Sequence, residues 1–325
     1  MKETWIMLSA FTLSNNRLSP IHLETESERR PENPIWIDVV AATSEERRWV
    51  ERTYKLTLPR PEHLRDIEAS ARFYEENSEV HLRSDFLLGK LSDSRSVTVA
   101  FVLSGDILFS VHEEDLPVFH SLRTRTHLQS GEIESSKDVL IDLYSMDVEF
   151  SADALEEVYA DLGEVSQAVL QRKLSDKAAA AVLASIAQAE HLNGRIRRNV
   201  MDTRRAMSFL MRSKVLSPAQ HEDARQIMQD IDSLDGHTSF LFDKINFLMS
   251  ATVGFININQ NKIVRLFSVA SVALLPPMLI ASIYGMNFRH MPELEWVMGY
   301  VYALGLMVLS VLLPFWLFLR KGWLK

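Results

Sequence analysis

The stretch that decides the fold is LFSVASVALLPPMLIASIYGMNF, residues 266–288, which has 23 residues and no charged side chain. A second uncharged stretch of 24 residues, WVMGYVYALGLMVLSVLLPFWLFL, follows at 296–319. At about 1.5 Å per residue, a helix of either length runs roughly 35 Å, enough to cross a hydrocarbon core of about 30 Å. We therefore predict two transmembrane helices. The alternative is a hydrophobic hairpin buried in a large soluble core.

The charge of the chain divides at the same place. Residues 260–325 hold six of the 35 Lys and Arg and two of the 43 Asp and Glu, which leaves a net charge of −12 on residues 1–259. Nucleic acids and anionic lipids bind basic surfaces, so this acidic part attracts cations and excludes nucleic acid as its main partner.

Sequence motifs for catalysis are missing from the chain. It has no cysteine, which excludes disulfides, thiolate metal sites and thiol catalysis. The segment 112–115, His-Glu-Glu-Asp, lacks the spacing of the His-Glu-x-x-His zinc motif, and the sequence contains no phosphate-binding loop, nucleophile elbow or dinucleotide fingerprint. We predict that the chain is not an enzyme and has no catalytic residue.

Residues 1–135 have the pattern of a mixed α/β domain. Runs of β-forming residues at 35–40, 97–103 and 107–111 predict strands, and Ser104-Gly105-Asp106 between the last two predicts a hairpin turn. Ser44 precedes a helical pattern and is the predicted N-cap of that helix.

Residues 136–262 have a helical period and predict a stalk of long helices. Breaks are expected at 174–176 and 215–218, where Ser217 followed by Pro218 is a strong helix start. A continuous helix from Pro218 to Tyr284 would have 67 residues and run roughly 100 Å. It would carry the chain from the stalk through the first span, although Gly236 and Gly254 weaken its helix propensity.

The positive charges predict the topology. Five Lys and Arg flank the two spans on the side of the termini, at 262, 265, 320, 321 and 325, whereas the connecting loop has one Arg and two Glu. The positive-inside rule then places both termini and the acidic domain in the cytoplasm. The predicted segments are a first span at 263–288, an outer loop at 289–295, a second span at 296–319 and a basic tail at 320–325.

The first span has two unusual features, the pair Pro276-Pro277 and a stripe of small and polar residues. The pair removes backbone donors and produces either a simple kink or a bend that faces a pore. The stripe follows helical steps through Asn261, Val264, Ser268, Ser271, Leu275, Met278 and Ser282. Polar ends and an apolar middle suit a pore with a hydrophobic gate, and a helix-packing stripe has the same pattern.

The second span has aromatic residues near its ends, which predicts a supporting helix that faces lipid. One pore-facing span in each chain cannot enclose a pore. A channel therefore requires a homo-oligomer, whose number of subunits the pattern does not set.

Gly285-Met286-Asn287 closes the first span, and Met291-Pro292-Glu293-Leu294 lies in the short loop after it. This arrangement resembles the signature of the CorA magnesium transporter family. The resemblance covers the chain from about Met7, and further segments at 66–72, 201–206, 246–249 and 254–258 are similar to proteobacterial CorA proteins.

The resemblance implies an α+β membrane protein that forms a homopentameric funnel, with an N-terminal cytoplasmic α/β domain, long stalk helices and two C-terminal transmembrane helices. Its implied selectivity filter is Gly285, Met286 and Asn287, and Glu293 belongs to its periplasmic loop. The implied pore-lining residues are Asn261, Val264, Phe267, Leu275 and Met278. Met278 departs from the threonine often found in the family.

The resemblance also implies a regulatory Mg²⁺ site between subunits. Asp66 is the candidate on one side, although Arg65 stands where the family often has Glu. Asp230 is the candidate on the other side, with Asp232 in reserve. The alternative is that these are ordinary solvated acids.

The function implied is Mg²⁺ influx, with Co²⁺ and Ni²⁺ also carried, through the inner membrane of a bacterium. The membrane potential would drive this influx, and cytosolic Mg²⁺ would gate it. Two alternatives remain: a zinc-transporting relative with the same signature, and a membrane-anchored sensor or scaffold without a pore.

Overall fold

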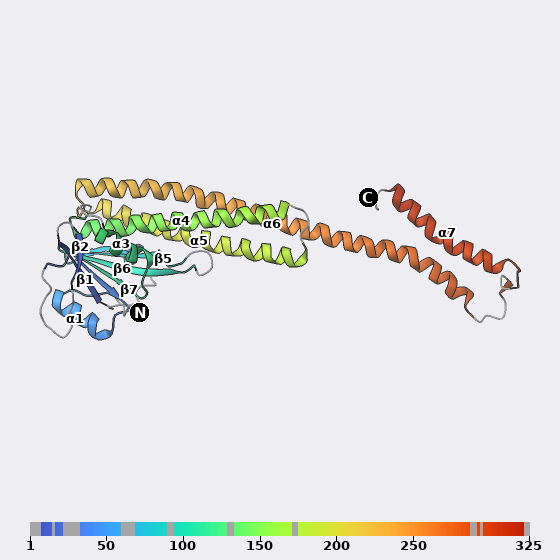
Figure 1. Ribbon diagram of the computed structural model, residues 1–325, viewed down its shortest axis with the longest axis horizontal. Helices are drawn as coiled ribbons and strands as arrows, with labels where there is room; N and C mark the ends of the chain where they lie inside the picture. Colours follow the sequence, from blue (N-terminus) through green and yellow to red (C-terminus); the bar gives the residue numbers. More distant parts are fainter. Residues whose placement is uncertain are drawn as a thin grey trace. The chain divides into compact units, whose positions relative to one another are not determined.

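The computed structural model describes residues 8–14, 17–21, 33–59, 69–89, 94–128, 133–170, 175–286, 291–292 and 295–321 (Figure 1). It divides into two compact units, one with the sheet and residues up to Met249, the other with Ser250–Lys325 and the short stretch Leu174–Ala179. In chain order the elements are β1 (Leu8–Ser14), β2 (Arg17–Ile21), β3 (Trp36–Val40), α1 (Ser44–Tyr54), α2 (Ala69–Arg72), β4 (Phe73–Glu76), β5 (Glu79–Leu87), β6 (Ser96–Ser104), β7 (Ile107–His112), α3 (Pro117–Leu128), α4 (Ser136–Leu170), α5 (Asp176–Arg212), α6 (Pro218–Tyr284) and α7 (Gly299–Arg320).

The first unit contains a seven-stranded sheet in the order β2-β1-β3-β7-β6-β5-β4. Strands β3 and β7 pair in parallel, and the other neighbours are antiparallel. The predicted strands at 35–40, 97–103 and 107–111 are confirmed as β3, β6 and β7. The predicted hairpin turn is also confirmed, because Gly105 adopts a φ of 60° between β6 and β7, a conformation that glycine adopts without strain.

Helices cover both faces of this sheet. On one face, α1 and the loop after it pack on apolar side chains of β1, β3, β6 and β7. On the other face, Phe86, Phe101, Phe119 and Tyr144 are fully buried and bring β5, β6, α3 and α4 together. The rings of Phe101 and Phe119 are stacked with centroids 6.3 Å apart. Each face therefore has its own apolar core.

The N-cap of α1 is Thr43 and not Ser44, so that prediction is wrong by one residue. The Thr43 hydroxyl accepts a hydrogen bond from the backbone N–H of Glu46, and the Glu46 carboxylate accepts one from the Thr43 N–H. This reciprocal capping box requires a Glu three residues after the cap, and only Thr43 has Glu46 in that position.

Helices α4, α5 and the first part of α6 lie side by side in the first unit (Figure 1). The predicted start of α6 is confirmed, since the Ser217 hydroxyl accepts from the Gln220 N–H at 3.3 Å and the Gln220 side chain accepts from the Ser217 N–H at 3.0 Å. The helix continues without a break through Gly236 and Gly254 to Tyr284, as predicted. It therefore belongs to both units.

A buried ion cluster lies on the α3 side of the sheet. Asp38 of β3 is fully buried and accepts hydrogen bonds from Ser110 (2.6 Å), His112 (2.9 Å) and Arg123 (2.9 Å). The other ring nitrogen of His112 lies 2.6 Å from the carbonyl oxygen of Glu114, which can only accept. Both ring nitrogens therefore donate, and His112 is an imidazolium.

The pKa values of this pair follow from that geometry. Burial alone would raise the pKa of Asp38, but the charge and hydrogen bond of His112, with Arg123 and Ser110, hold it below its usual value. Burial lowers the pKa of His112, and Asp38 outweighs this and raises it. The Asp38 contribution to stability is thus lost as the pH falls below about 4, and that of His112 is lost as the pH rises beyond about 6.5.

Replacing Asp38 by Asn should destabilise the sheet by about 3–5 kcal/mol, because it leaves His112 as a buried cation without its counter-ion. Arg123 would keep only its second partner, the Asp115 carboxylate. The loss should be measured on the full-length protein as faster hydrogen exchange of the β3 and β7 amides. Asp106→Asn, at the exposed β6–β7 turn, is the matched control and should change little. Unchanged exchange in Asp38→Asn would show that the ion cluster does not hold the sheet.

Candidate functional site

The second unit carries large apolar side chains on its surface. The most apolar windows of α6 and α7 are 0% and 6% buried, and side chains such as Phe267 and Met278 are 71% and 70% exposed. A hairpin inside a soluble core would be covered by protein, so this observation excludes that alternative for the described residues. Both helices are long and apolar enough to cross a membrane.

The predicted stripe of the first span lies on one open face of α6. Its members and Phe267 are all exposed: Asn261, Val264, Phe267, Ser268, Ser271, Leu275, Met278 and Ser282. The opposite face of the same helix is half-buried at Val269, Ala273, Pro276, Ile280 and Tyr284. The five predicted pore residues therefore share a surface that the rest of this chain does not cover.

Pro276 and Pro277 lie inside α6, which remains helical on both sides of them. Neither can donate to the carbonyl one turn earlier, so the carbonyls of Val272 and Ala273 lose their usual partners. The Ser268 hydroxyl donates to the carbonyl of Val264 at 2.9 Å, which satisfies the hydroxyl proton within the helix.

The helix ends just before the predicted filter. The Gly285 N–H still donates to the Ala281 carbonyl at 2.9 Å, and the Met286 N–H donates to the Ile283 carbonyl at 3.2 Å. A Cβ added at Gly285 would lie 3.2 Å from the Ala281 carbonyl oxygen, so the glycine fits closely against its own preceding turn. Asn287 and Glu293 lie outside the described residues.

Of the three predicted regulatory acids, the structure describes only Asp230 and Asp232. Asp66 lies outside the described residues. Asp230 is exposed on α6 and accepts a long hydrogen bond from Gln226 (3.4 Å), and Asp232 forms an ion pair with Arg204 of α5. Among the described residues, no group of three His, Asp or Glu side chains is placed to hold a metal ion.

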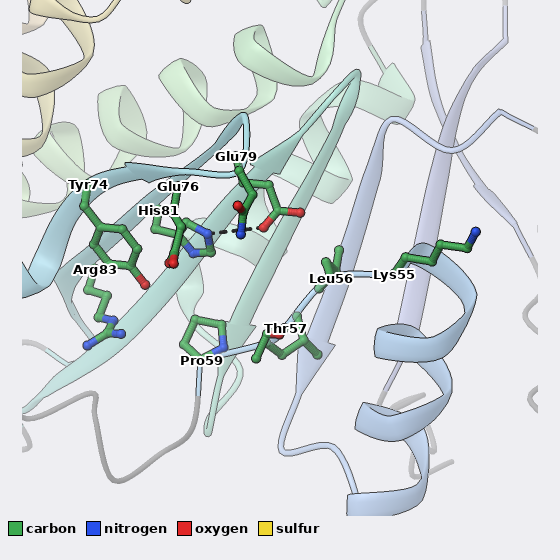
Figure 2. A pocket seen from close by; sticks show the side chains of 11 residues that line it. Lys55, Leu56, Thr57, Pro59, Tyr74, Glu76, Glu79, His81 and Arg83 are labelled. Carbon is green, nitrogen blue, oxygen red and sulfur yellow. Dashed lines mark ion pairs between the residues drawn. The ribbon is translucent and has the colours of Figure 1, made fainter.

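Sequence reasoning missed a polar pocket of about 480 Å³ on the first unit, between the β4–β5 hairpin and the loop after α1 (Figure 2). Its lining combines Lys55 and Arg83 with Glu76, Glu79 and His81. The imidazole of His81 stacks on Tyr74 and lies 3.3 Å from the Glu79 carboxylate. Burial lowers the pKa of His81, and Glu79 opposes that change. The charges nearly cancel, so the pocket favours neither anions nor cations.

A family model described as a CorA-like Mg²⁺ transporter protein matches residues 31–321. The chain is also 42% identical over 319 residues to the magnesium transport protein CorA of Escherichia coli K12, covering 98% of this chain and all of that relative. The chain belongs to the CorA-like Mg²⁺ transporter family. Members of this family are transporters and not enzymes, in agreement with the sequence prediction.

Solved structures share the fold of this chain. The complete structure of the CorA magnesium transporter from Methanocaldococcus jannaschii aligns with a TM-score of 0.77 at 17% identity, covering 98% of this chain and 99% of that one. The ZntB cytoplasmic domain from Vibrio parahaemolyticus aligns with a TM-score of 0.60 at 15% identity, covering 78% of this chain and 98% of that domain. At these identities the likeness concerns the fold alone.

Proposed function

We propose that the chain is one subunit of a channel through which Mg²⁺ enters a bacterial cell across the inner membrane, with both termini in the cytoplasm. The observation that carries this proposal is the full-length identity of 42% to a magnesium transport protein, combined with a Gly-Met-Asn sequence at the end of an exposed membrane helix. A sensor or scaffold without a pore would need neither this signature nor Pro276-Pro277.

The channel is a homopentameric funnel in which five copies of the α6 membrane segment surround one axis. The open face with Asn261, Val264, Phe267, Leu275 and Met278 is turned toward that axis. Support comes from the polar residues on this face, since a membrane helix with a polar stripe needs water or another copy of the chain beside that stripe. Helix α7 faces lipid; near its inner end Arg320 lies over the Trp316 ring at 5.4 Å, which suits an interfacial anchor.

The outer mouth is a ring of Asn287 side chains, next to Gly285 and Met286. Mg²⁺ gives up its water reluctantly. Amide oxygens accept hydrogen bonds from the waters around the ion without removing them, whereas a ring of carboxylates would bind more tightly and release the ion more slowly. Glu293, in the loop outside, adds negative charge that attracts cations toward the mouth.

The gate is the apolar part of the same face. Val264, Phe267 and Leu275 form a constriction that excludes water while closed, and an ion cannot pass a dry apolar ring. Met278, which lies between this constriction and the mouth, adds an apolar side chain where the family often has a hydroxyl. Ion passage at this level depends on waters that the ion carries with it.

Influx needs no chemical fuel. Moving a single positive charge inward is favourable by about 2.3 kcal/mol per 100 mV of inside-negative membrane potential. For a divalent cation the figure is about 4.6 kcal/mol per 100 mV. The net charge of −12 on residues 1–259 adds cation attraction on the cytoplasmic side.

Cytosolic Mg²⁺ closes the channel by binding between neighbouring subunits at Asp66 and Asp230. The exposed carboxylate of Asp230 is suited to face another copy, whereas Asp232 is already paired with Arg204 and stays in reserve. Bound Mg²⁺ cancels the repulsion between facing carboxylates, and its loss lets the subunits separate and the gate open.

Co²⁺ and Ni²⁺ are further proposed substrates. Zn²⁺ transport, the alternative that the shared signature leaves open, is the second candidate function, and a comparison of ions in one flux assay separates the two.

Replacing Asn287 by Ala should reduce Mg²⁺ uptake into proteoliposomes at least about tenfold, which corresponds to about 1.4 kcal/mol at the mouth. Asn287→Asp should instead bind Mg²⁺ more tightly and conduct more slowly. Oligomer size in detergent should be unchanged in both variants, as a control for folding.

Unchanged Mg²⁺ uptake by Asn287→Ala would contradict the proposed filter. Uptake of Zn²⁺ but not Mg²⁺ by the parent protein would favour the zinc-transporting alternative, and no uptake of any divalent ion would favour a scaffold.

The double variant Asp66→Asn with Asp230→Asn should keep conducting at millimolar internal Mg²⁺, where the parent closes, because it lacks the carboxylates that Mg²⁺ holds together. Its proteolysis should also lose the protection that Mg²⁺ gives the parent. Asp106→Asn with Glu149→Gln removes two exposed charges elsewhere and is the matched control. Mg²⁺ protection that persists in the first double variant would remove these residues from the sensing site.

A further inference from the structure

A buried carboxylate with only neutral partners joins the helices of the first unit to the sheet. Asp147 of α4 is fully buried. Its two oxygens accept from the amide nitrogen of Asn199 at 3.1 and 3.0 Å and one accepts from the Thr203 hydroxyl at 3.2 Å, both on α5. The backbone of Leu87, at the end of β5, also donates to this carboxylate.

The charged groups that face Asp147 do not neutralise it. On α5, Asp202 is 2% exposed and accepts from Arg72 at 2.6 Å and from the Asp85 N–H at 2.9 Å. Arg72 also lies 3.6 Å from the Asp85 carboxylate of β5. On α4 itself, the Tyr144 hydroxyl is hydrogen bonded to Ser84 at 2.8 Å and is neutral. Arg72 thus serves two other carboxylates, and Asp147 adds a third negative charge nearby.

An unused acceptor lies beside Asp147. The side-chain oxygen of Asn199 is buried and has no hydrogen-bond partner among the described residues. The oxygen and nitrogen of an amide exchange places by a simple flip. A protonated Asp147 could then donate to the Asn199 oxygen at the distance that the nitrogen now occupies. The proton would remove a buried charge. The flipped amide would still have a buried polar group without a partner, because its N–H groups would lie where the oxygen lies now.

We propose that Asp147 is a proton-binding site, occupied while α4, α5 and β5 are packed together and emptied as the surrounding solution becomes alkaline. The pKa of Asp147 agrees with this: burial, with a smaller contribution from the Asp202 charge, raises it to about 7 against the hydrogen bonds from Asn199, Thr203 and Leu87.

This site lies on a path of contacts to the helix that enters the membrane. Helix α5, which holds Asn199 and Thr203, contacts α6 through the Arg204–Asp232 ion pair and through Asn193, whose amide donates to the Thr238 carbonyl at 3.0 Å. We call the packing of α4, α5 and β5 around Asp147 the joint. Movement of α5 when this joint loosens is therefore transmitted to the first part of α6. The cytosolic origin of the proton rests on the proposed function, which places the first unit in the cytoplasm. The existence of the proton site does not depend on that function.

The sign of the pH dependence is fixed by the direction of the shift. The unfolded chain releases this proton near pH 4 and the folded chain near pH 7, so the folded state holds the extra proton between them. The contribution of Asp147 to stability therefore falls as the pH rises through this window and is constant above it. His112 adds a loss in the same direction, and it does so equally in the parent and in any Asp147 variant.

The test uses the full-length protein in detergent and compares the parent with Asp147→Asn, whose amide supplies the donor that the proton would supply. At pH 8 the variant should unfold at a higher temperature than the parent, with a gain of at least about tenfold in the folding equilibrium constant. At pH 5 the gain should be much smaller, and it should vanish as the pH approaches 4, where the unfolded chain also binds the proton. Infrared spectra of the parent should show a protonated-carboxyl band at pH 6 that disappears by pH 8, and the variant should lack it.

Asp202→Asn is the matched control. It leaves Arg72 without its closest counter-ion, so it should destabilise the protein at both pH values. The infrared titration of Asp147 should persist but move to lower pH, because the Asp202 charge raises the pKa of Asp147. The proposal is overturned if Asp147→Asn is destabilised equally at both pH values, or if the parent shows no protonated carboxyl at pH 6. Neither readout involves transport, so these outcomes are independent of whether Mg²⁺ uptake is found.

Discussion

Hydrocarbon cannot satisfy polar groups, and this constraint governs the second unit. Its two helices expose apolar side chains almost everywhere, so lipid is the solvent that suits them. The exception is one face of α6, where Asn261 and several serines interrupt the apolar surface. A lone helix cannot shelter such a face from lipid, whereas copies around an axis can. In the proposed pore, this face lies against water on the axis between the copies.

The first unit follows a different physical rule, because its interior buries charge as well as apolar surface. Around Asp38, opposite charges meet at hydrogen-bond distance and hold each other's protonation states at neutral pH. Around Asp147, the partners are neutral and the charge is left uncompensated. The first cluster secures the sheet, and the second makes the joint between the sheet and the helices sensitive to protons. Helix α5 contacts α6 through the Arg204–Asp232 ion pair and the Asn193–Thr238 hydrogen bond. Because α6 extends from this unit into the membrane, changes at the Asp147 site have a route through these contacts to the proposed gate.

Sequence reasoning worked where a local pattern has a local cause. A membrane span was predicted from 23 residues without charge, a hairpin turn from Gly105 between two β-rich runs, and a helix start from Ser217 before Pro218. It failed by one residue at the N-cap of α1, because the side chain of Glu46 pairs with Thr43 and not with Ser44. It gave no sign of the Arg72–Asp202 pair, whose members are 130 residues apart, or of the pocket beside His81. Such contacts arise from how the helices and strands pack, and the periodicity of the sequence does not predict them.

The most direct test of the central claim asks which face of α6 meets water. The chain has no cysteine, so single cysteines can be introduced without removing any. A water-soluble thiol reagent should block Mg²⁺ entry through Ser282→Cys, on the open face, and leave Ile280→Cys, on the half-buried face, unaffected. Block through Ile280→Cys alone, or through neither position, would contradict a pore lined by this face.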